Sequence, residues 1–354
     1  MGIERVGGPG MTAFTIAQFD DSISVDDLRS LARDPRVEVL QCDRPVRDAA
    51  WSLINEHFCP VRPDVRLRIY GHYSSTCDLG FARLIPNARH FAADCLTRVA
   101  RLEALAELRN LESLSLGIYE LKDLAILEWM PTSLTSLSLG ATRSKRPSLE
   151  PLGRFRSIRK LYVEGHAKGI EALSSLLELE DLTLRSITTP DLRYLRDLPN
   201  LRSLEIKLGG IRDLGEIEGK TSLRYLEIWQ VRGFEKIDVV GRLPGLQDLW
   251  LRSMPHIQRL PDLSDAKALR RIVLHNLKGF HDFRALETAP ALEEFRLLDG
   301  RRQDPAQLLP VLRNPRIRRI SAGFGSDRKD LEFLRRLEEH GKTPVEKWGP
   351  FEFR

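Results

Sequence analysis

The fold of this chain is decided by residues 198–251, which read LPNLRSLEIKLGGIRDLGEIEGKTSLRYLEIWQVRGFEKIDVVGRLPGLQDLWL. Three segments share one apolar skeleton, L-x-x-L-x-L, in which Ile can replace the last Leu: 201–206, 223–228 and 246–251. Self-similarity at a fixed short period is typical of repeat proteins, in which each unit packs only on its neighbours. The stretch therefore predicts a stack of similar units.

The same skeleton recurs over most of the chain. The second apolar residue of each copy serves as a marker, and successive markers lie 21 to 25 residues apart: Phe91, Leu114, Leu137, Leu161, Leu182, Leu204, Leu226, Leu249, Ile272, Phe295 and Ile320. Two less regular copies precede them, around Val39 and Leu67. Apolar alternation around each marker predicts one short strand per unit.

These units resemble the short class of leucine-rich repeats found in bacterial internalins. The fullest match is the series Leu102, Leu105, Leu108, Leu111, Leu114 and Leu116. The resemblance implies an α/β leucine-rich repeat solenoid, or horseshoe, with a parallel sheet on the concave face and short turns or 3-10 segments on the convex face. The family motif continues to Asn or Cys, but here those positions hold Tyr119, Thr142, His166, Ile187, Gly209, Val231, Met254, Leu277 and Gly300. Since no asparagine ladder satisfies the backbone there, we expect some irregular loops.

Four regions follow from these patterns. We expect a flexible leader at 1–24, irregular strand–helix units at 25–85, regular repeats at 86–325, and a cap helix with a tail at 326–354. Helices are predicted from Val25 and over 49–58, strands over 37–40 and 65–70, and a third short helix over 79–85.

The last region is expected to cover the end of the array, because a solenoid needs a polar cap. Asp327 is the predicted N-cap of a helix whose apolar face carries Leu331, Leu334 and Leu337. The tail over 343–354 contains Trp348, Phe351 and Phe353, which either fold back onto the last repeat or form a detached docking peptide.

Composition limits the classes of function. The 354 residues include 55 Lys and Arg against 50 Asp and Glu, a net charge of +5 that is small for this length. No apolar run is long enough to cross a membrane, and the N-terminus lacks the pattern of a cleaved signal peptide. We therefore expect a cytoplasmic protein, or one delivered by a signal-independent route.

Four cysteines lie in the first third of the chain: Cys42, Cys59, Cys77 and Cys95. Without a signal peptide they are expected to be reduced and buried, and a disulfide-linked N-terminal cap is the alternative. Their spacing, and that of His57 and His72, does not match a zinc motif. No metal or cofactor is expected.

The residues between the core leucines point away from the core, so the outward face can be read from the sequence. Between residues 160 and 275 this face holds large aromatic and charged residues, which form the predicted partner-binding site: Tyr162, Arg185, Glu205, Lys207, Tyr225, Glu227, Trp229, Trp250, Arg252 and His275. Tyr, Trp and Arg dominate binding hot spots. The chain is therefore expected to bind another protein or peptide, unless a loop, the tail or the side chains themselves cover these aromatics.

Two other functions are compatible with parts of the sequence. Glu205 and Glu227 fall side by side on neighbouring strands, as a carbohydrate-acting enzyme would require, but Lys207 and Arg185 flank them and no catalytic motif is present. We therefore expect a neutralised charge pair and no catalytic residues.

The second alternative is nucleic-acid or anionic-surface binding. The C-terminal third is rich in basic residues: Arg270, Arg271, Arg296, Arg301, Arg302, Arg313, Arg316, Arg318, Arg319, Arg328, Lys329, Arg335 and Arg336. Such a stripe would suit phosphates. Acidic residues are interleaved with it: Asp299, Asp304, Asp327, Asp330, Glu332, Glu338 and Glu339. A solvated face of mixed charge is the simpler interpretation, so nucleic acid is not the expected partner.

Overall fold

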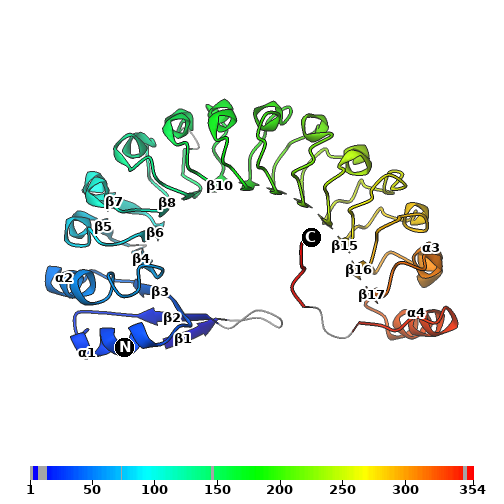
Figure 1. The fold of residues 1–354 in the computed structure, drawn as a ribbon, viewed down its shortest axis with the longest axis horizontal. Helices are drawn as coiled ribbons and strands as arrows, with labels where there is room; N and C mark the ends of the chain where they lie inside the picture. The colour runs from blue at the N-terminus through cyan, green and yellow to red at the C-terminus, as the bar shows by residue number, and fades with distance from the viewer. Residues whose placement is uncertain (1–2, 7–13, 73, 145–146, 346–348) are drawn as a thin grey trace. The chain divides into compact units, whose positions relative to one another are not determined.

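The computed structural model describes residues 3–6, 14–72, 74–144, 147–345 and 349–354, which fall into two compact units, Met1–Leu179 and Glu180–Arg354. In each unit parallel strands lie side by side on one face, and short helices lie on the opposite face (Figure 1). This is the predicted leucine-rich repeat architecture.

Unit 1 contains the irregular N-terminal elements and the first regular repeats. Its strands are β1 (Ile3–Val6), β2 (Phe14–Gln18), β3 (Val37–Cys42), β4 (Arg66–Tyr70), β5 (Thr76–Asp78), β6 (His90–Leu96), β7 (Arg98–Ala100), β8 (Ser113–Ile118), β9 (Ser136–Leu139) and β10 (Lys160–Glu164). Its helices are α1 (Val25–Arg33), α2 (Asp48–His57) and the 3-10 segments η1 (Gly80–Leu84), η2 (Leu102–Glu107), η3 (Ala125–Trp129), η4 (Glu150–Arg154) and η5 (Ile170–Ser175). The sheet order is β1-β2-β3-β4-β6-β8-β9-β10, with β5 and β7 forming a separate parallel pair.

Unit 2 is more regular. Its strands are β11 (Asp181–Arg185), β12 (Ser203–Lys207), β13 (Tyr225–Trp229), β14 (Asp248–Arg252), β15 (Arg271–His275), β16 (Glu294–Leu298) and β17 (Arg319–Ala322). The 3-10 segments are η6 (Arg193–Leu195), η7 (Gly215–Ile217), η8 (Asp238–Arg242), η9 (Arg284–Leu286) and η10 (Pro305–Leu308), and two helices follow, α3 (Leu309–Arg313) and α4 (Asp327–Glu339). All neighbouring strands are parallel, and the markers pair in register from Leu204 through Leu226 and Leu249 to Ile272. These four side chains are fully buried.

The expected flexible leader over 1–24 is wrong for its second half. Strand β2 pairs in parallel with β3 and in antiparallel with β1, and the side chains of Ala17 and Phe19 are buried. Ser24 then caps α1 through a capping box with Asp27. Residues 1–2 and 7–13 lie outside the described part of the chain.

The turns that follow the strands of unit 2 are regular, contrary to the irregular loops we expected. The first residue after each of six strands has a left-handed backbone with φ between 51° and 56°: Ser186, Leu208, Gln230, Ser253, Asn276 and Asp299. In this conformation its N–H points at the next strand. For example, the N–H of Leu208 donates to the carbonyl of Trp229 at 2.9 Å, and that of Gln230 donates to the carbonyl of Arg252 at 2.9 Å. At the positions where the family has asparagine, the N–H of Gly210 donates to the carbonyl of Ile187 at 3.0 Å, and that of Arg232 donates to the carbonyl of Gly209 at 2.9 Å. Backbone groups therefore bond one another where an asparagine side chain is missing.

The C-terminal helix α4 differs in detail from its prediction. Ser326 occupies the N-cap position, one residue before Asp327, and the Asp330 carboxylate accepts from the N–H of Phe324 at 2.8 Å. The buried face consists of Phe333 and Leu337, since Phe333 packs edge-on against Phe324 with 5.7 Å between ring centroids. Leu331 and Leu334, which we expected on that face, are 62% and 43% exposed.

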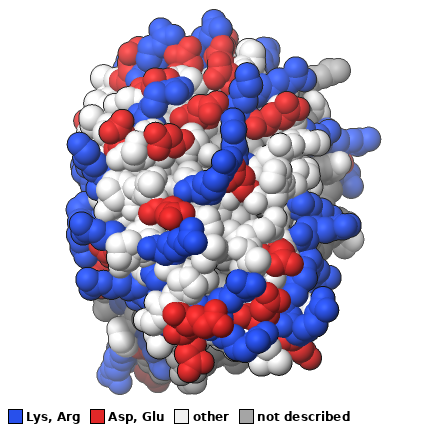
Figure 2. Space-filling model, turned by 90° about the vertical axis from the view of Figure 1, so that its right-hand side faces the viewer, with Lys and Arg blue, Asp and Glu red and all other residues white. Residues whose placement is uncertain are grey.

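The side of the molecule that carries α3 and α4 in Figure 1 shows intermixed acidic and basic side chains (Figure 2).

The four cysteines, all within the described residues, are free. Cys42, Cys59 and Cys77 are buried, and burial raises the pKa of the Cys59 and Cys77 thiols to about 12. Cys95 is exposed, contrary to the expectation that all four are buried. Its backbone is left-handed, with φ of 53°, near the end of β6, where the pairing with β8 shifts in register.

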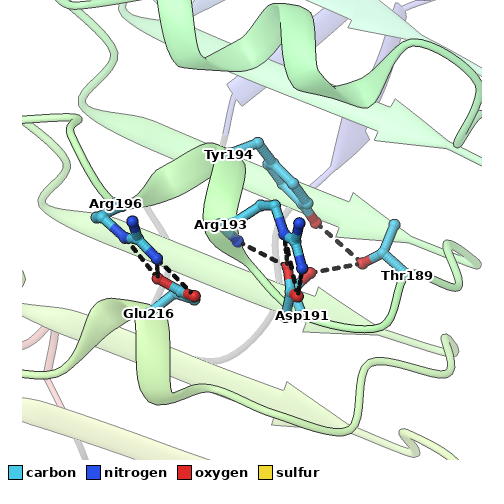
Figure 3. Close-up of polar contacts among 6 residues, drawn as sticks. All are labelled: Thr189, Asp191, Arg193, Tyr194, Arg196 and Glu216. Carbon is cyan, nitrogen blue, oxygen red and sulfur yellow. Dashed lines mark hydrogen bonds and ion pairs between the residues drawn. The ribbon is translucent and has the colours of Figure 1, made fainter.

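Aspartates open the outer turns of unit 2. The carboxylate of Asp191 accepts the backbone N–H of Arg193 at 3.0 Å and also binds its guanidinium (Figure 3). Asp213, Asp262 and Asp282 accept the N–H two residues ahead in the same way. This local bond satisfies an N–H that would otherwise lack a partner at the start of a turn.

One ion pair in Figure 3 joins consecutive outer segments. The guanidinium of Arg196, just after η6, binds both carboxylate oxygens of Glu216 in η7 at 2.7 and 2.9 Å. The Tyr194 hydroxyl lies 3.3 Å from that of Thr189, whose side chain also donates to the carbonyl of Asp191. Neighbouring repeats are thus linked by side chains on the helix side as well as by backbone hydrogen bonds between the strands.

The outer aspartates predict a specific response to acid. Hydrogen bonds from Arg193 and Arg284 lower the pKa of Asp191 and Asp282 to about 2. The pKa of Asp in an unfolded chain is about 3.9. The stability that Asp191 and Asp282 add is therefore complete above about pH 4 and is lost as the pH falls towards about 2. The double variant Asp191→Asn with Asp282→Asn keeps the turn acceptor but loses the charge. Its melting temperature should therefore fall less between pH 5 and pH 2 than that of the wild type.

The matched control is Asp265→Asn, at an exposed aspartate. It should leave the wild-type slope of melting temperature against pH unchanged. A double variant with the wild-type slope would contradict the role given to Asp191 and Asp282.

Candidate functional site

The candidate site lies on the strand face of unit 2, between β11 and β15. Register pairing places Thr183, Glu205, Glu227 and Trp250 side by side in one row, and Arg185, Lys207, Trp229, Arg252 and His275 in a second row. We call these residues, with Tyr225, the strand-face cluster. Tyr162 belongs to β10 of unit 1, where its hydroxyl donates to Glu164 at 2.9 Å.

Two carboxylates and one ammonium group form the centre of the strand-face cluster. The Lys207 ammonium forms ion pairs with Glu205 and, at 3.2 Å, with Glu227. The Arg252 guanidinium adds a second ion pair to Glu227 at 2.9 Å. The hydroxyl of Tyr225 donates to Glu227 at 3.2 Å, and that of Thr183 donates to Glu205 at 3.2 Å. The expected neutralised charge pair is therefore present.

Glu227 is 4% exposed, although it points away from the leucine core. Its neighbours on the same face cover it. Burial and the nearby carboxylates of Glu227 and Glu205 raise the pKa of Tyr225, so its hydroxyl stays protonated and remains a donor. The charges at the centre are thus paired before any partner arrives.

Trp229 lies between two arginines. The guanidinium carbon of Arg252 is 5.0 Å from the centre of the Trp229 ring, and that of Arg185 is 5.8 Å from it. Both distances allow cation–π attraction. Tyr225, Trp229 and Trp250 are half-buried, so neighbouring side chains cover part of each ring. The cause is that the long charged side chains lie against the rings.

His275 ends the second row. Burial, followed by the charge of Arg252, lowers its pKa below the ordinary value of 6.5. The imidazole is therefore neutral at pH 7. It contributes a polar ring to this end of the cluster without adding charge.

A buried ion pair that the sequence did not reveal lies beside the cluster. The Arg271 guanidinium binds both oxygens of the Asp248 carboxylate, and the two residues are 8% and 1% exposed. Burial raises the pKa of Asp248, and the bonds from Arg271 oppose that rise. The indole N–H of Trp250 donates to the same carboxylate at 3.2 Å. Asp248 therefore orients both Arg271 and Trp250.

The C-terminal tail reaches this ion pair. The chain first pairs with β17 at Pro344, and the N–H of Val345 donates to the carbonyl of Ile320 at 3.1 Å. The segment 349–354 lies against β14 and β15, where the Phe351 ring centre is 4.4 Å from the Arg271 guanidinium (Figure 1). The start of the tail thus pairs with the last repeat, as expected, but the aromatic segment 349–354 folds back further, onto β14 and β15. Trp348 lies outside the described residues.

A hollow of about 830 Å3 separates the tail from the strand ends. Phe351, Phe353 and Arg354 line it on the side of the tail, and Tyr225, Asp248 and Arg271 line it on the side of the sheet. The strand-face cluster, the buried ion pair and the hollow are therefore continuous along one face of unit 2.

Several arginines of the basic C-terminal third form ion pairs with carboxylates of the same region. Arg270 binds Glu293 at 3.0 Å and Arg319 binds Glu294 at 3.3 Å, while Arg301 and Arg336 pair with Asp299 and Glu332. The face drawn in Figure 2 carries both signs of charge rather than one basic field. Among the described residues, no group of three His, Cys, Asp or Glu side chains is placed to hold a metal ion.

The buried Asp248–Arg271 pair predicts an asymmetric response to substitution. Asp248→Ala leaves the Arg271 charge buried without its partner, which should lower the free energy of unfolding by about 3–5 kcal/mol. The double variant Asp248→Ala with Arg271→Leu should regain most of this loss, because no buried charge remains. Chemical denaturation measures both effects. A single variant as stable as the wild type, or a double variant no better than the single, would contradict the burial of this pair.

Comparison with known proteins supports the fold. No family model and no curated protein matches the chain. Among solved structures, the internalin InlF of Listeria monocytogenes is 17% identical, covers 85% of this chain and 89% of its own, and has a TM-score of 0.56. TLR13, solved in complex with ssRNA13, is 15% identical with a TM-score of 0.57, over 87% of this chain and 46% of TLR13.

A leucine-rich repeat protein of Leptospira interrogans is 13% identical over 92% of this chain and 93% of its own, with a TM-score of 0.49. At such identities the likeness concerns the fold alone. The likeness to InlF, together with the repeat register described above, shows that this chain has the leucine-rich repeat fold found in bacterial internalins.

Proposed function

We propose that this protein is a non-enzymatic scaffold that binds another protein through the strand face of unit 2. The observation that carries the proposal is the pair Trp229 and Trp250, held half-exposed on adjacent strands among Arg185, Arg252 and Tyr225. Trp, Tyr and Arg are the residues that dominate protein-binding hot spots. In the described part of unit 2, the helices lie on the opposite face of the sheet, so a partner has direct access to these side chains.

Preorganisation supports the same proposal. The ion pairs of Lys207 and Arg252 with Glu227, and the stacking of arginines on Trp229, fix these side chains in the free protein. Less side-chain entropy is therefore lost when a partner binds. The cluster also spans five strands, about 19 Å from first to last at a strand spacing of ~4.8 Å. Such an extended surface suits a protein or peptide better than a small metabolite, which prefers an enclosed pocket.

The two alternative functions have less support. Nucleic acid would need unpaired cations, but arginines of the C-terminal third such as Arg270 and Arg319 are already paired with carboxylates. A carbohydrate-acting enzyme would need Glu205 or Glu227 as a proton donor, yet both carboxylates are held by Lys207. Binding to phosphates would also weaken steeply with salt, which separates the first alternative from an aromatic-centred interface.

We further propose a reducing, bacterial-type cytoplasm as the place of action. Its support is that Cys42, Cys59 and Cys77 are free and buried, and free buried thiols persist where the surroundings are reducing. Across the described residues, the helices are too short or too polar to traverse a lipid bilayer.

The direct test begins with affinity capture by the purified chain and identification of the bound protein by mass spectrometry. The double variant Trp229→Ala with Trp250→Ala should then weaken binding of that partner by at least about 2 kcal/mol, roughly thirtyfold, because both anchors are removed. Its circular dichroism spectrum and melting temperature should stay close to those of the wild type.

The matched control is Trp129→Ala, because Trp129 is 71% exposed and belongs to η3 of unit 1. It should leave affinity unchanged. Unfolding of the double variant would mean that the two tryptophans are structural. Wild-type affinity in a folded double variant would place the partner on another surface.

A further inference from the structure

The tail segment 349–354 is held mainly through its backbone. The side-chain amide of Gln247, just before β14, donates to the carbonyl of Arg354 at 2.5 Å and accepts the Arg354 N–H at 2.8 Å. The Arg270 guanidinium donates to the carbonyl of Glu352 at 2.8 Å. Contacts of this kind recognise an extended segment through main-chain groups that every peptide has.

Two side chains of the tail add specificity. The Phe351 ring lies 4.4 Å from the guanidinium of Arg271 and 5.2 Å from that of Arg270, and its edge meets Phe353 at a centroid distance of 4.9 Å. Three residues after Phe351, the Arg354 guanidinium binds Glu293 at 3.3 Å. An aromatic ring and a basic group three residues later therefore have complementary positions on the sheet.

Gln247 is unusual among the residues at its place in the repeat. The corresponding residues before the other strands of unit 2 are charged: Glu180, Arg202, Arg224, Arg270, Glu293 and Arg318. Among these residues, Gln247 alone has a neutral amide, and it is 5% exposed. Its side chain forms hydrogen bonds with both the N–H and the main-chain oxygen of Arg354. A buried amide needs hydrogen-bond partners, so this position favours a bound segment.

The tail does not fill the space that it covers. The hollow of about 830 Å3 remains between its rings and the strand ends, and it continues from Arg271 past Tyr225 to Asp181 and Arg202. Phe353 and Arg354 are exposed on its rim. The groove along the N-terminal ends of β11–β16, here called the edge groove, is thus longer than the segment seated in it.

We infer that the edge groove is a peptide-binding site for an extended segment of another protein with the pattern aromatic, any residue, aromatic, basic. The chain's own tail, Phe351-Glu352-Phe353-Arg354, occupies the site in cis and is displaced when the partner segment binds. This goes beyond the proposed function, since it assigns the adjoining edge of the same face and the chemistry of its ligand. It can hold whether or not Trp229 and Trp250 bind a partner.

Tethering determines how strongly the tail competes. A segment joined to its site by a short connection has an effective concentration in the millimolar range. The partner segment must therefore bind more tightly than the tail or extend into the unfilled hollow. Weakening the tail's own contacts should raise the apparent affinity of any competing peptide, because a larger fraction of the sites is open.

Fluorescence anisotropy with a labelled peptide of sequence GPFEFR tests this on the full chain. The tail-released variant, Phe351→Ala with Arg354→Ala, should bind the peptide at least about tenfold more tightly than the wild type, because its tail competes less. Adding Gln247→Ala to that variant should reduce binding at least about tenfold, through loss of both main-chain bonds. Gln258→Ala in the same background is the matched control, since Gln258 is exposed outside the groove, and it should have no effect. The peptide GPAEAA should not bind.

Hydrogen exchange on the wild-type chain gives a second reading that does not depend on the variants folding. Excess GPFEFR should speed exchange of the Arg354 amide, because its bond to Gln247 is released. Unchanged exchange, equal peptide affinity in the wild-type and tail-released chains, or full binding after Gln247→Ala would each overturn the inference. A concentration-dependent dimer that disappears in the tail-released variant would also overturn it, since the ligand would then be the tail of a second copy.

Discussion

The structure of unit 2 depends on the register between neighbouring strands. Leu204, Leu226 and Leu249 pair in line, and each is fully buried. A shift by one residue would turn every leucine outward, so the cost of exposing them fixes the register. The left-handed residue after each of β11 to β16 supports the same register through the backbone, as Leu208 does by donating to the carbonyl of Trp229. Core burial and turn geometry therefore specify one arrangement.

That register positions the candidate site. Because the strands are aligned, residues 22 or 23 positions apart in the sequence become neighbours in a row, and Glu205 meets Glu227 while Lys207 meets Trp229. The Lys207 ammonium can then reach both carboxylates, and Arg252 can pair with Glu227 and stack on Trp229. The Asp248–Arg271 pair extends these contacts to the tail. One physical constraint thus organises the charges, the aromatic rings and the edge groove.

Much of this could be predicted from the sequence, because the leucine period is a local signal that tertiary structure does not override. It identified the strands of unit 2, the neutralised pair of Glu205 and Glu227, and the direction in which Trp229 and Trp250 point. What it missed depends on contacts between distant residues. The contact between Phe351 and Arg271 joins positions 80 residues apart in the sequence. The exposure of Leu331 depends on which side of α4 packs against the rest of the fold. The outer Asp turns were a readable signal, as in Asp191-Leu192 and Asp282-Phe283, that we did not use.

Amide hydrogen exchange measured residue by residue is the most direct test of the central claim, that left-handed turns replace the missing asparagine ladder and hold the strands in register. The amides of Leu208, Gln230 and Ser253 each donate to the end of the following strand. They should therefore exchange as slowly as the strand amides of β12 to β14, within about tenfold, because the same cooperative opening exposes both. Exchange as fast as that of an exposed loop amide would contradict the claim, and the strand face would then need another source of order.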